Sequence, residues 1–187
     1  MADKKMEEVT RTFSEAVAGG RVEVYNEFSL QHEYGIYLRS TMSQLKVQFE
    51  RNVAFFFDNP RQFIKKEIDI VAFSPDKTLK HSALELKFPT NGQYPEQMFK
   101  FCKDIAFLEQ LKHAGFANAY FLAFADDRLF YGGPGEGIYG YFRSGVPLTG
   151  TITKPTGTRN DSVRLTGTYR IRWHSVRNDL RYAFLEI

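Results

Sequence analysis

The sequence predicts an α/β fold in a single domain. The expected order is a helix, three antiparallel strands, a second helix and a parallel strand, followed by a C-terminal β extension. Short apolar segments of strand length alternate with longer segments whose apolar residues recur at helical spacing. One such helix lies between two apolar strands, as in a crossover that joins parallel neighbours. We assign residues 26–131 to the core and residues 132–187 to a Gly/Pro-rich loop and a basic β extension.

One helix is expected before the first strand, and the segment that precedes it has two possible structures. Residues Asp3–Ala18 carry apolar side chains near helical spacing, so this segment is either a short amphipathic helix or a frayed terminus. Residues Tyr25–Gln44 form the stronger helix, which Asn26 or Ser29 can cap. Its apolar stripe consists of Leu30, Tyr34, Tyr37, Leu38 and Met42.

Three strands and a helix–strand unit complete the core. Lys46–Phe57 alternates at first and then becomes fully apolar, as in a strand that enters the centre of a sheet. Ile64–Ser74 and His81–Phe88 are two short apolar strands joined by a turn, and the short connections predict antiparallel pairing. A helix over Pro95–His113 and a buried strand over Asn118–Ala125 follow.

The C-terminal third has a different character. Residues 132–161 are rich in Gly, Pro and Thr, with one strand-like stretch at Gly137–Arg143. Ser162–Trp173 returns to strict alternation, in which Arg164, Arg170 and Arg172 share one face. Residues 154–187 hold seven cations against three anions, which makes this the basic region of the chain. The cations are Lys154, Arg159, Arg164, Arg170, Arg172, Arg177 and Arg181.

Composition excludes several classes of site. One cysteine, Cys102, excludes an intrachain disulfide and any Cys-based zinc or iron–sulfur site within one chain. The four histidines do not have the spacing of metal ligands. No Gly-Lys-Ser/Thr phosphate-binding loop is present, so we expect no nucleotide cofactor. The formal charge of +3 does not by itself indicate nucleic acid. With no membrane-length apolar run and no signal-peptide pattern, a cytoplasmic protein without membrane contact is expected.

Charged residues interrupt the two short apolar strands. Asp69 lies between isoleucines, and Glu85 and Lys87 alternate with leucine and phenylalanine. Because side chains alternate between the faces of a strand, Glu85 and Lys87 share one face. If the strands pair, two carboxylates and an ammonium group meet on an apolar sheet, where unpaired charge costs several kcal/mol. Such a cluster needs mutual pairing or a hard divalent cation held by oxygen ligands.

The chain resembles the PD-(D/E)xK phosphodiesterase superfamily in its order of helices and strands and in one motif. This motif is Asp69, a spacer of fifteen residues and then Glu85-Leu86-Lys87. That family has the restriction-endonuclease-like fold of many restriction enzymes, junction resolvases and repair nucleases. Its proline before the aspartate is replaced here by Ile68, as in many members. The resemblance implies a DNA endonuclease in which Asp69, Glu85 and the Leu86 carbonyl hold Mg²⁺ or Mn²⁺. Lys87 would position the attacking water and counter the developing charge.

The resemblance also implies two accessory residues. The family often adds a carboxylate from the first helix, for which Glu33 is the candidate and Glu27 its competitor; a solvated helix glutamate is the alternative. It often places glutamine or lysine at the start of the second helix, where Gln97 fits as a catalytic residue. Lys100 lies one turn further, and we favour an ordinary surface role for it.

The expected partner is DNA. Arg164, Arg170 and Arg172 are candidate contacts with its phosphate backbone, although charged edge residues that discourage strand pairing are the alternative. A homodimer is compatible with the cutting of both strands of a duplex by two copies of one site. The principal alternative function is a nuclease-like fold that binds nucleic acid or protein without cutting. A third is an ordinary α/β interaction protein in which Lys87 simply neutralises Asp69 and Glu85.

Overall fold

A computed structural model of the chain describes residues 2–90, 92–157 and 161–187, so the predicted cation Arg159 lies outside the described residues. The helices and strands are α1 (Ala2–Ala18), α2 (Glu27–Thr41), β1 (Lys46–Asn52), β2 (Glu67–Phe73), β3 (Lys80–Lys87), α3 (Tyr94–His113), β4 (Asn118–Ala125), α4 (Tyr139–Arg143), β5 (Leu148–Thr153), β6 (Ser162–Tyr169), β7 (Trp173–Arg177) and β8 (Leu180–Glu186). The predicted α/β class is confirmed.

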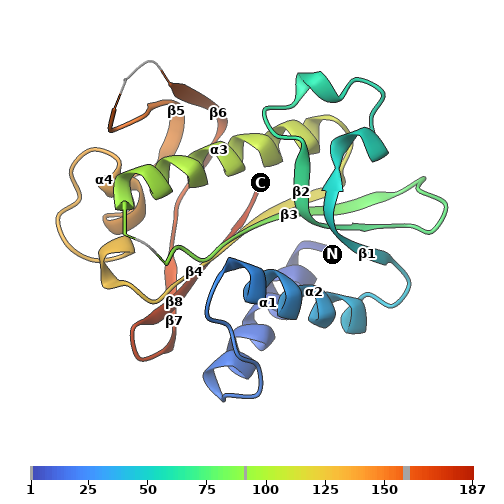
Figure 1. Cartoon of the computed structure of the whole chain (residues 1–187), viewed down its shortest axis with the longest axis horizontal. Coiled ribbons are helices and arrows are strands. Elements are labelled where there is room, and N and C mark those ends of the chain that lie inside the picture. Colours follow the sequence, from blue (N-terminus) through green and yellow to red (C-terminus); the bar gives the residue numbers. More distant parts are fainter. Residues whose placement is uncertain (1, 91, 158–160) are drawn as a thin grey trace.

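A mixed six-stranded sheet forms the middle layer of the molecule (Figure 1). Its strand order is β1-β2-β3-β4-β8-β7. Strands β1, β2 and β3 pair antiparallel, and β4 pairs parallel to β3 after the α3 crossover. Helices α1 and α2 cover one face, while α3, α4 and the β5–β6 hairpin lie on the other (Figure 1). The directions expected for the first four strands are therefore present.

Alternation along the central strands divides the core between the two faces. Leu84 and Leu86 of β3 pack with α1 and α2, whereas Ala83 packs with α3. Since neighbouring strand positions point to opposite faces, the side chains of Glu85 and Lys87 fall on the α3 side. The N-terminal segment is helical, and its buried residues Phe13 and Val17 dock on the other side of the sheet.

Helix α2 begins where the capping pattern predicts. The Asn26 side chain accepts a hydrogen bond from the Ser29 backbone N–H at 2.8 Å, and the Ser29 hydroxyl accepts one from the Asn26 N–H at 3.1 Å. This reciprocal capping box identifies Asn26 as the N-cap. Buried Gln31 then ties the helix to the sheet, because its Nε2 donates to the backbone carbonyl of Asp69 at 2.8 Å.

The strand expected over Lys46–Phe57 is wrong in its second half. β1 ends at Asn52, and residues Val53–Phe55 form a 3₁₀ turn. The Asn52 side chain accepts a hydrogen bond from the Ala54 N–H at 2.9 Å, which caps the turn and ends the strand. The rings of Phe55 and Phe56 then fold back onto Phe73, with centroids 5.7 and 5.3 Å away. The apolar run covers the sheet edge instead of extending it.

Two expectations for the C-terminal third are also wrong. Gly137–Arg143 contains the short helix α4 and no strand, because Gly137 adopts a positive φ and Phe142 turns inward against Phe101. The strand expected over Ser162–Trp173 is two strands of different sheets: β6 ends at Tyr169, and β7 begins at Trp173. Strands β5 and β8 were not expected, and β8 pairs with β4 to extend the main sheet.

A buried carboxylate fastens the β5–β6 hairpin to α3. Glu109 is 5 % exposed, and its two oxygens accept hydrogen bonds from the backbone N–H groups of Thr166 and Gly167 at 2.6–3.0 Å. The Tyr169 hydroxyl donates to the same carboxylate at 2.8 Å. Hydrogen bonds to a charged acceptor are stronger than neutral ones, so this contact fixes the hairpin against the helix.

The substitution Glu109→Ala is expected to lower the free energy of unfolding by about 2–4 kcal/mol, because it leaves buried N–H donors unpaired. Urea unfolding followed by circular dichroism measures the change, with exposed Lys100→Ala on the same helix as control. Equal stability of the Glu109 variant and the wild type would show that the carboxylate does not hold the hairpin.

Candidate functional site

The β2–β3 register brings the sequence motif together. Ile70 pairs with Leu84, so Asp69 lies one step beyond, opposite Glu85. The Asp69 carboxylate accepts a hydrogen bond from the Leu86 backbone N–H at 2.7 Å. Lys87 follows two residues after Glu85 on the same face of β3. Two neighbouring strands therefore present the three predicted side chains to the α3 side of the sheet.

Lys87 lies at the centre of these charges. Its Nζ is 3.7 Å from Asp69 Oδ2 and 3.1 Å from Glu27 Oε1, and it donates to the Leu86 carbonyl at 2.8 Å. The side chain is 13 % exposed, so one side of the group reaches the surface. Lys87 is therefore in contact with both Asp69 and the Leu86 carbonyl.

Two residues that sequence reasoning missed complete the cluster. The Lys65 ammonium contacts the Glu85 carboxylate and donates to Asp104 Oδ1 at 2.8 Å. Asp104 Oδ2 is 3.6 Å from Lys87 Nζ. Asp104 could have been identified from the sequence, since it is an acidic residue on the buried stripe of α3, three residues after Phe101. Lys65 could not have been identified in this way, because its position depends on how the segment before β2 packs against α3.

Burial dominates the electrostatics of the carboxylates. It raises the pKa of Asp69 to about 6, although Lys87, Lys65 and the Leu86 N–H favour the ionised form. Burial also raises the pKa of Glu85 well above its usual range, and the neighbouring charges of Asp69 and Asp104 add to the effect. Asp69 and Glu85 are therefore costly to ionise together.

The surroundings favour the charged forms of the two ammonium groups. Burial disfavours their charged forms, but the surrounding carboxylates outweigh it and raise the pKa of Lys65 and of Lys87. Both lysines therefore remain charged at neutral pH. Three carboxyl groups thus face two ammonium groups, and the Glu27 carboxylate contacts Lys87 at the rim.

The donor set suits a hard divalent cation. Glu85 Oε1 and Asp104 Oδ2 are buried oxygens without a hydrogen-bond partner in the described structure. Carboxylate and carbonyl oxygens are the preferred ligands of Mg²⁺ and Mn²⁺, and a cation bound beside Asp69 and Glu85 would favour their ionised forms. In the parts of the chain that are described, no three Asp, Glu, His or Cys residues are grouped as a ready metal cage. Ammonium groups lie among the carboxylates in this arrangement.

The two first-helix candidates differ in position. Glu27, in the first turn of α2, contacts Lys87, and its Oε2 accepts from the Phe88 N–H at 3.5 Å. Glu33 pairs instead with His32 at 3.6 Å. Glu27 is therefore the α2 carboxylate that the fold brings to the cluster, in place of the preferred candidate Glu33.

A surface depression of about 460 Å³ opens beside Lys87. It lies between the start of α2, the end of β3 and the first turns of α3, and it includes both Gln97 and Lys100. Phe28 at its rim is 75 % exposed. Gln97 and Lys100 thus share a hollow with Lys87; the resemblance implies such a position for Gln97, whereas an ordinary surface role was expected for Lys100.

The three candidate arginines are all exposed, but they do not share one strand face. Arg164 lies on β6, whereas Arg170 and Arg172 lie in the connection that leads to β7. The Arg170 guanidinium donates to the Gly145 carbonyl at 2.7 Å. The prediction that one strand carries all three arginines on one face is therefore wrong, because the chain leaves the two-stranded β5–β6 sheet after Tyr169.

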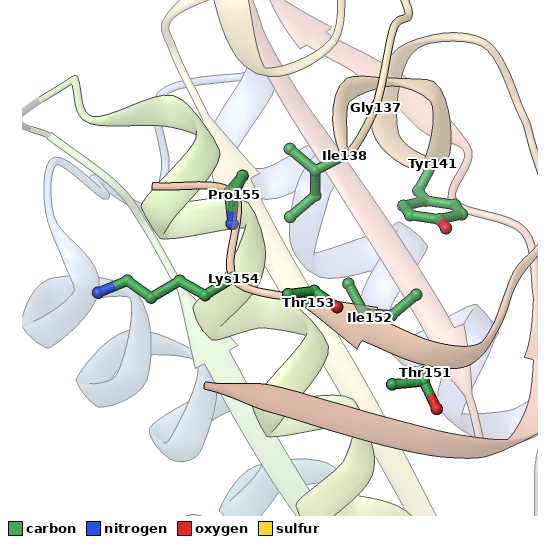
Figure 2. Close-up of a pocket in the computed structure, with 8 residues that line it drawn as sticks. All are labelled: Gly137, Ile138, Tyr141, Thr151, Ile152, Thr153, Lys154 and Pro155. Carbon is green, nitrogen blue, oxygen red and sulfur yellow. The ribbon is translucent and has the colours of Figure 1, made fainter. Parts of the chain in front are cut away.

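A second depression of about 350 Å³ lies between α4 and β5 (Figure 2). Ile138, Tyr141 and Ile152 give it an apolar character, and threonines supply its polar atoms. Lys154 is the charged residue of the lining, but its side chain extends away from the other labelled residues, and its Nζ is 3.6 Å from Glu96. This hollow has no group of charges comparable to the cluster around Glu85.

Comparisons of the chain with protein-family models, curated proteins and solved structures gave no match. None of the helices in the described part of the chain has the length and apolar character needed to cross a bilayer. The functional assignment therefore depends on the sequence motif and the geometry of the cluster.

Removal of the Lys65 charge is expected to destabilise the metal-free protein. Lys65→Met should lower the free energy of unfolding in EDTA by about 2–4 kcal/mol, because the buried Glu85 carboxylate loses its partner. Denaturant unfolding measures the loss, and Lys66→Met at the neighbouring exposed position is the control. The double variant Lys65→Met/Glu85→Gln should recover most of the stability, and failure to recover it would contradict the pairing.

Proposed function

We propose that this protein is a metal-dependent DNA endonuclease of the PD-(D/E)xK type, with a restriction-endonuclease-like core. The observation that carries the proposal is the placement of Asp69, Glu85 and Lys87 on one face of two paired strands, within a cluster of buried carboxyl and ammonium groups. The order of α2, three antiparallel strands, α3 and a parallel strand supports it, since the resemblance implies that order.

In this proposal Asp69, Glu85 and the Leu86 carbonyl hold Mg²⁺ or Mn²⁺, with Glu27 as the accessory acid. The bound ion would lower the pKa of a coordinated water and stabilise charge on the phosphate. Lys87 is close enough to Asp69 and to the Leu86 carbonyl to orient the attacking water. Its ammonium group also counters the negative charge that develops on the phosphate.

The depression beside Lys87 is the proposed entry for the DNA strand. Lys100 and Gln97 line it with polar groups, and the exposed ring of Phe28 lies at its rim. A cation attracts the phosphate backbone, and an exposed aromatic ring can stack on a base. Arg164, Arg170 and Arg172 are proposed only as more distant contributors to backbone attraction.

A non-cutting nucleic-acid-binding module is the second candidate. The contact between Lys65 and Glu85 favours it, because an ammonium group already partners the carboxylate that a catalytic ion would need. Saturable binding of Mg²⁺ distinguishes the two candidates, since a module without catalysis has no need of that affinity.

Cleavage of supercoiled plasmid in Mg²⁺ or Mn²⁺ tests the proposed roles. Asp69→Asn and Glu85→Gln should abolish cleavage through loss of metal ligands, and Lys87→Ala should slow it by about 10²–10³-fold. Glu67→Gln, an exposed acid on the same strand as Asp69, should cut at the wild-type rate. Undiminished cleavage by the folded Asp69 and Lys87 variants would refute the site.

Phe28→Ala and Lys100→Ala should weaken DNA binding without altering metal affinity. Loss of a stacking ring is worth about 1–3 kcal/mol of binding free energy. Loss of a phosphate contact should also reduce the dependence of affinity on salt. Fluorescence anisotropy with labelled single-stranded and duplex oligonucleotides in Ca²⁺ measures both effects. The exposed residue Ile36, further along α2, provides the control Ile36→Ala.

A further inference from the structure

Asp104 occupies a position where an apolar residue would be expected. It is 4 % exposed in the middle of α3, and it faces the sheet between buried Phe101 and Leu108. An isolated carboxylate in such a place is costly unless it is paired and hydrogen-bonded. The PD-(D/E)xK motif does not account for this residue, so its contacts need a separate explanation.

One ammonium group bridges the two most buried carboxylates. Lys65 contacts one oxygen of Glu85 and one oxygen of Asp104, and the second oxygen of each carboxylate has no hydrogen-bond partner in the described structure. Lys87 lies 3.6 Å from the free Asp104 oxygen but makes no hydrogen bond to it. Glu85 and Asp104 thus share one ammonium group through one oxygen each, and each keeps a second, buried oxygen without a hydrogen-bond partner in the described structure.

Lys65 itself is the least buried member of this group. Its side chain is 30 % exposed, and it comes from the segment that precedes β2. A lysine has a long flexible stem and a strongly hydrated head, so it can move into solvent without rearrangement of the sheet. Glu85 and Asp104, in contrast, are fixed on a central strand and on the helix that covers it.

We propose that Glu85 and Asp104 form a divalent-cation site and that Lys65 is its built-in counter-ion, which moves into solvent when the cation binds. A dication in place of the Lys65 ammonium, together with Lys87, would balance the charge of Asp69, Glu85 and Asp104. Glu85 is shared with the proposed catalytic metal site, so the inference rests on the proposed function for its role.

Calorimetric titration of the full chain with Ca²⁺ or Mn²⁺, without DNA, measures the site directly. Asp104→Asn should weaken binding at least tenfold or remove one ion from the stoichiometry. Lys65→Met should tighten binding at least tenfold, because the competing ammonium is gone, whereas Lys66→Met should bind as the wild type does. Unchanged binding by Asp104→Asn, or weaker binding by folded Lys65→Met, would overturn the proposal.

A measurement on the wild type avoids any folding defect of the variants. Acetic anhydride labelling with mass spectrometry reports how accessible each lysine is, with Lys66 as the internal reference. Labelling of Lys65 should rise at least fivefold when Mg²⁺ is added, and no rise would overturn the displacement.

The outcomes also separate this inference from the proposed function. Cleavage of DNA together with wild-type metal binding by Asp104→Asn would refute this site and leave the nuclease intact. Metal binding with the predicted dependence on Asp104 and Lys65, but without cleavage of any DNA form, would refute the nuclease and leave the site.

Discussion

The cost of burying charge between the sheet and α3 is the constraint on which this structure depends. Asp69, Glu85 and Asp104 lie where packing would favour apolar side chains, and their charge is offset by Lys65 and Lys87. Buried ion pairs contribute little to stability compared with apolar residues of the same size. A chain that required only a stable sheet–helix contact would gain little from five such groups, and this is the physical basis of the proposed metal site.

The rest of the fold positions this cluster. The short β2–β3 connection sets the register that places Asp69 beside Glu85, and the α3 crossover brings Asp104 over the same face. Gln31 ties α2 to the backbone of Asp69, which holds Glu27 within reach of Lys87. The opening beside Lys87 then connects the buried charges with solvent. In the proposed exchange, the carboxylates stay fixed on the sheet and on α3, and the Lys65 ammonium group gives way to the bound cation.

Local patterns in the sequence were sufficient for the elements that the cluster needs. The two-residue period of β3 predicted that Glu85 and Lys87 share a face, and capping residues predicted the start of α2. Prediction failed where tertiary contacts determine the local structure. The run Val53–Phe57 has strand composition, but a side-chain cap and the ring of Phe73 turn it over the sheet edge. Lys65 could not have been found, because nothing local distinguishes it from Lys66, which stays exposed.

The location of a bound metal ion tests the central claim most directly. Anomalous diffraction from crystals grown with Mn²⁺ would locate the ion without reference to activity. The account predicts a peak coordinated by the Glu85 carboxylate, with Asp69 or Asp104 as a second ligand and the Lys65 side chain turned towards solvent. Crystals grown in saturating Mn²⁺ that show no peak there, and that keep Lys65 in contact with Glu85, would contradict it.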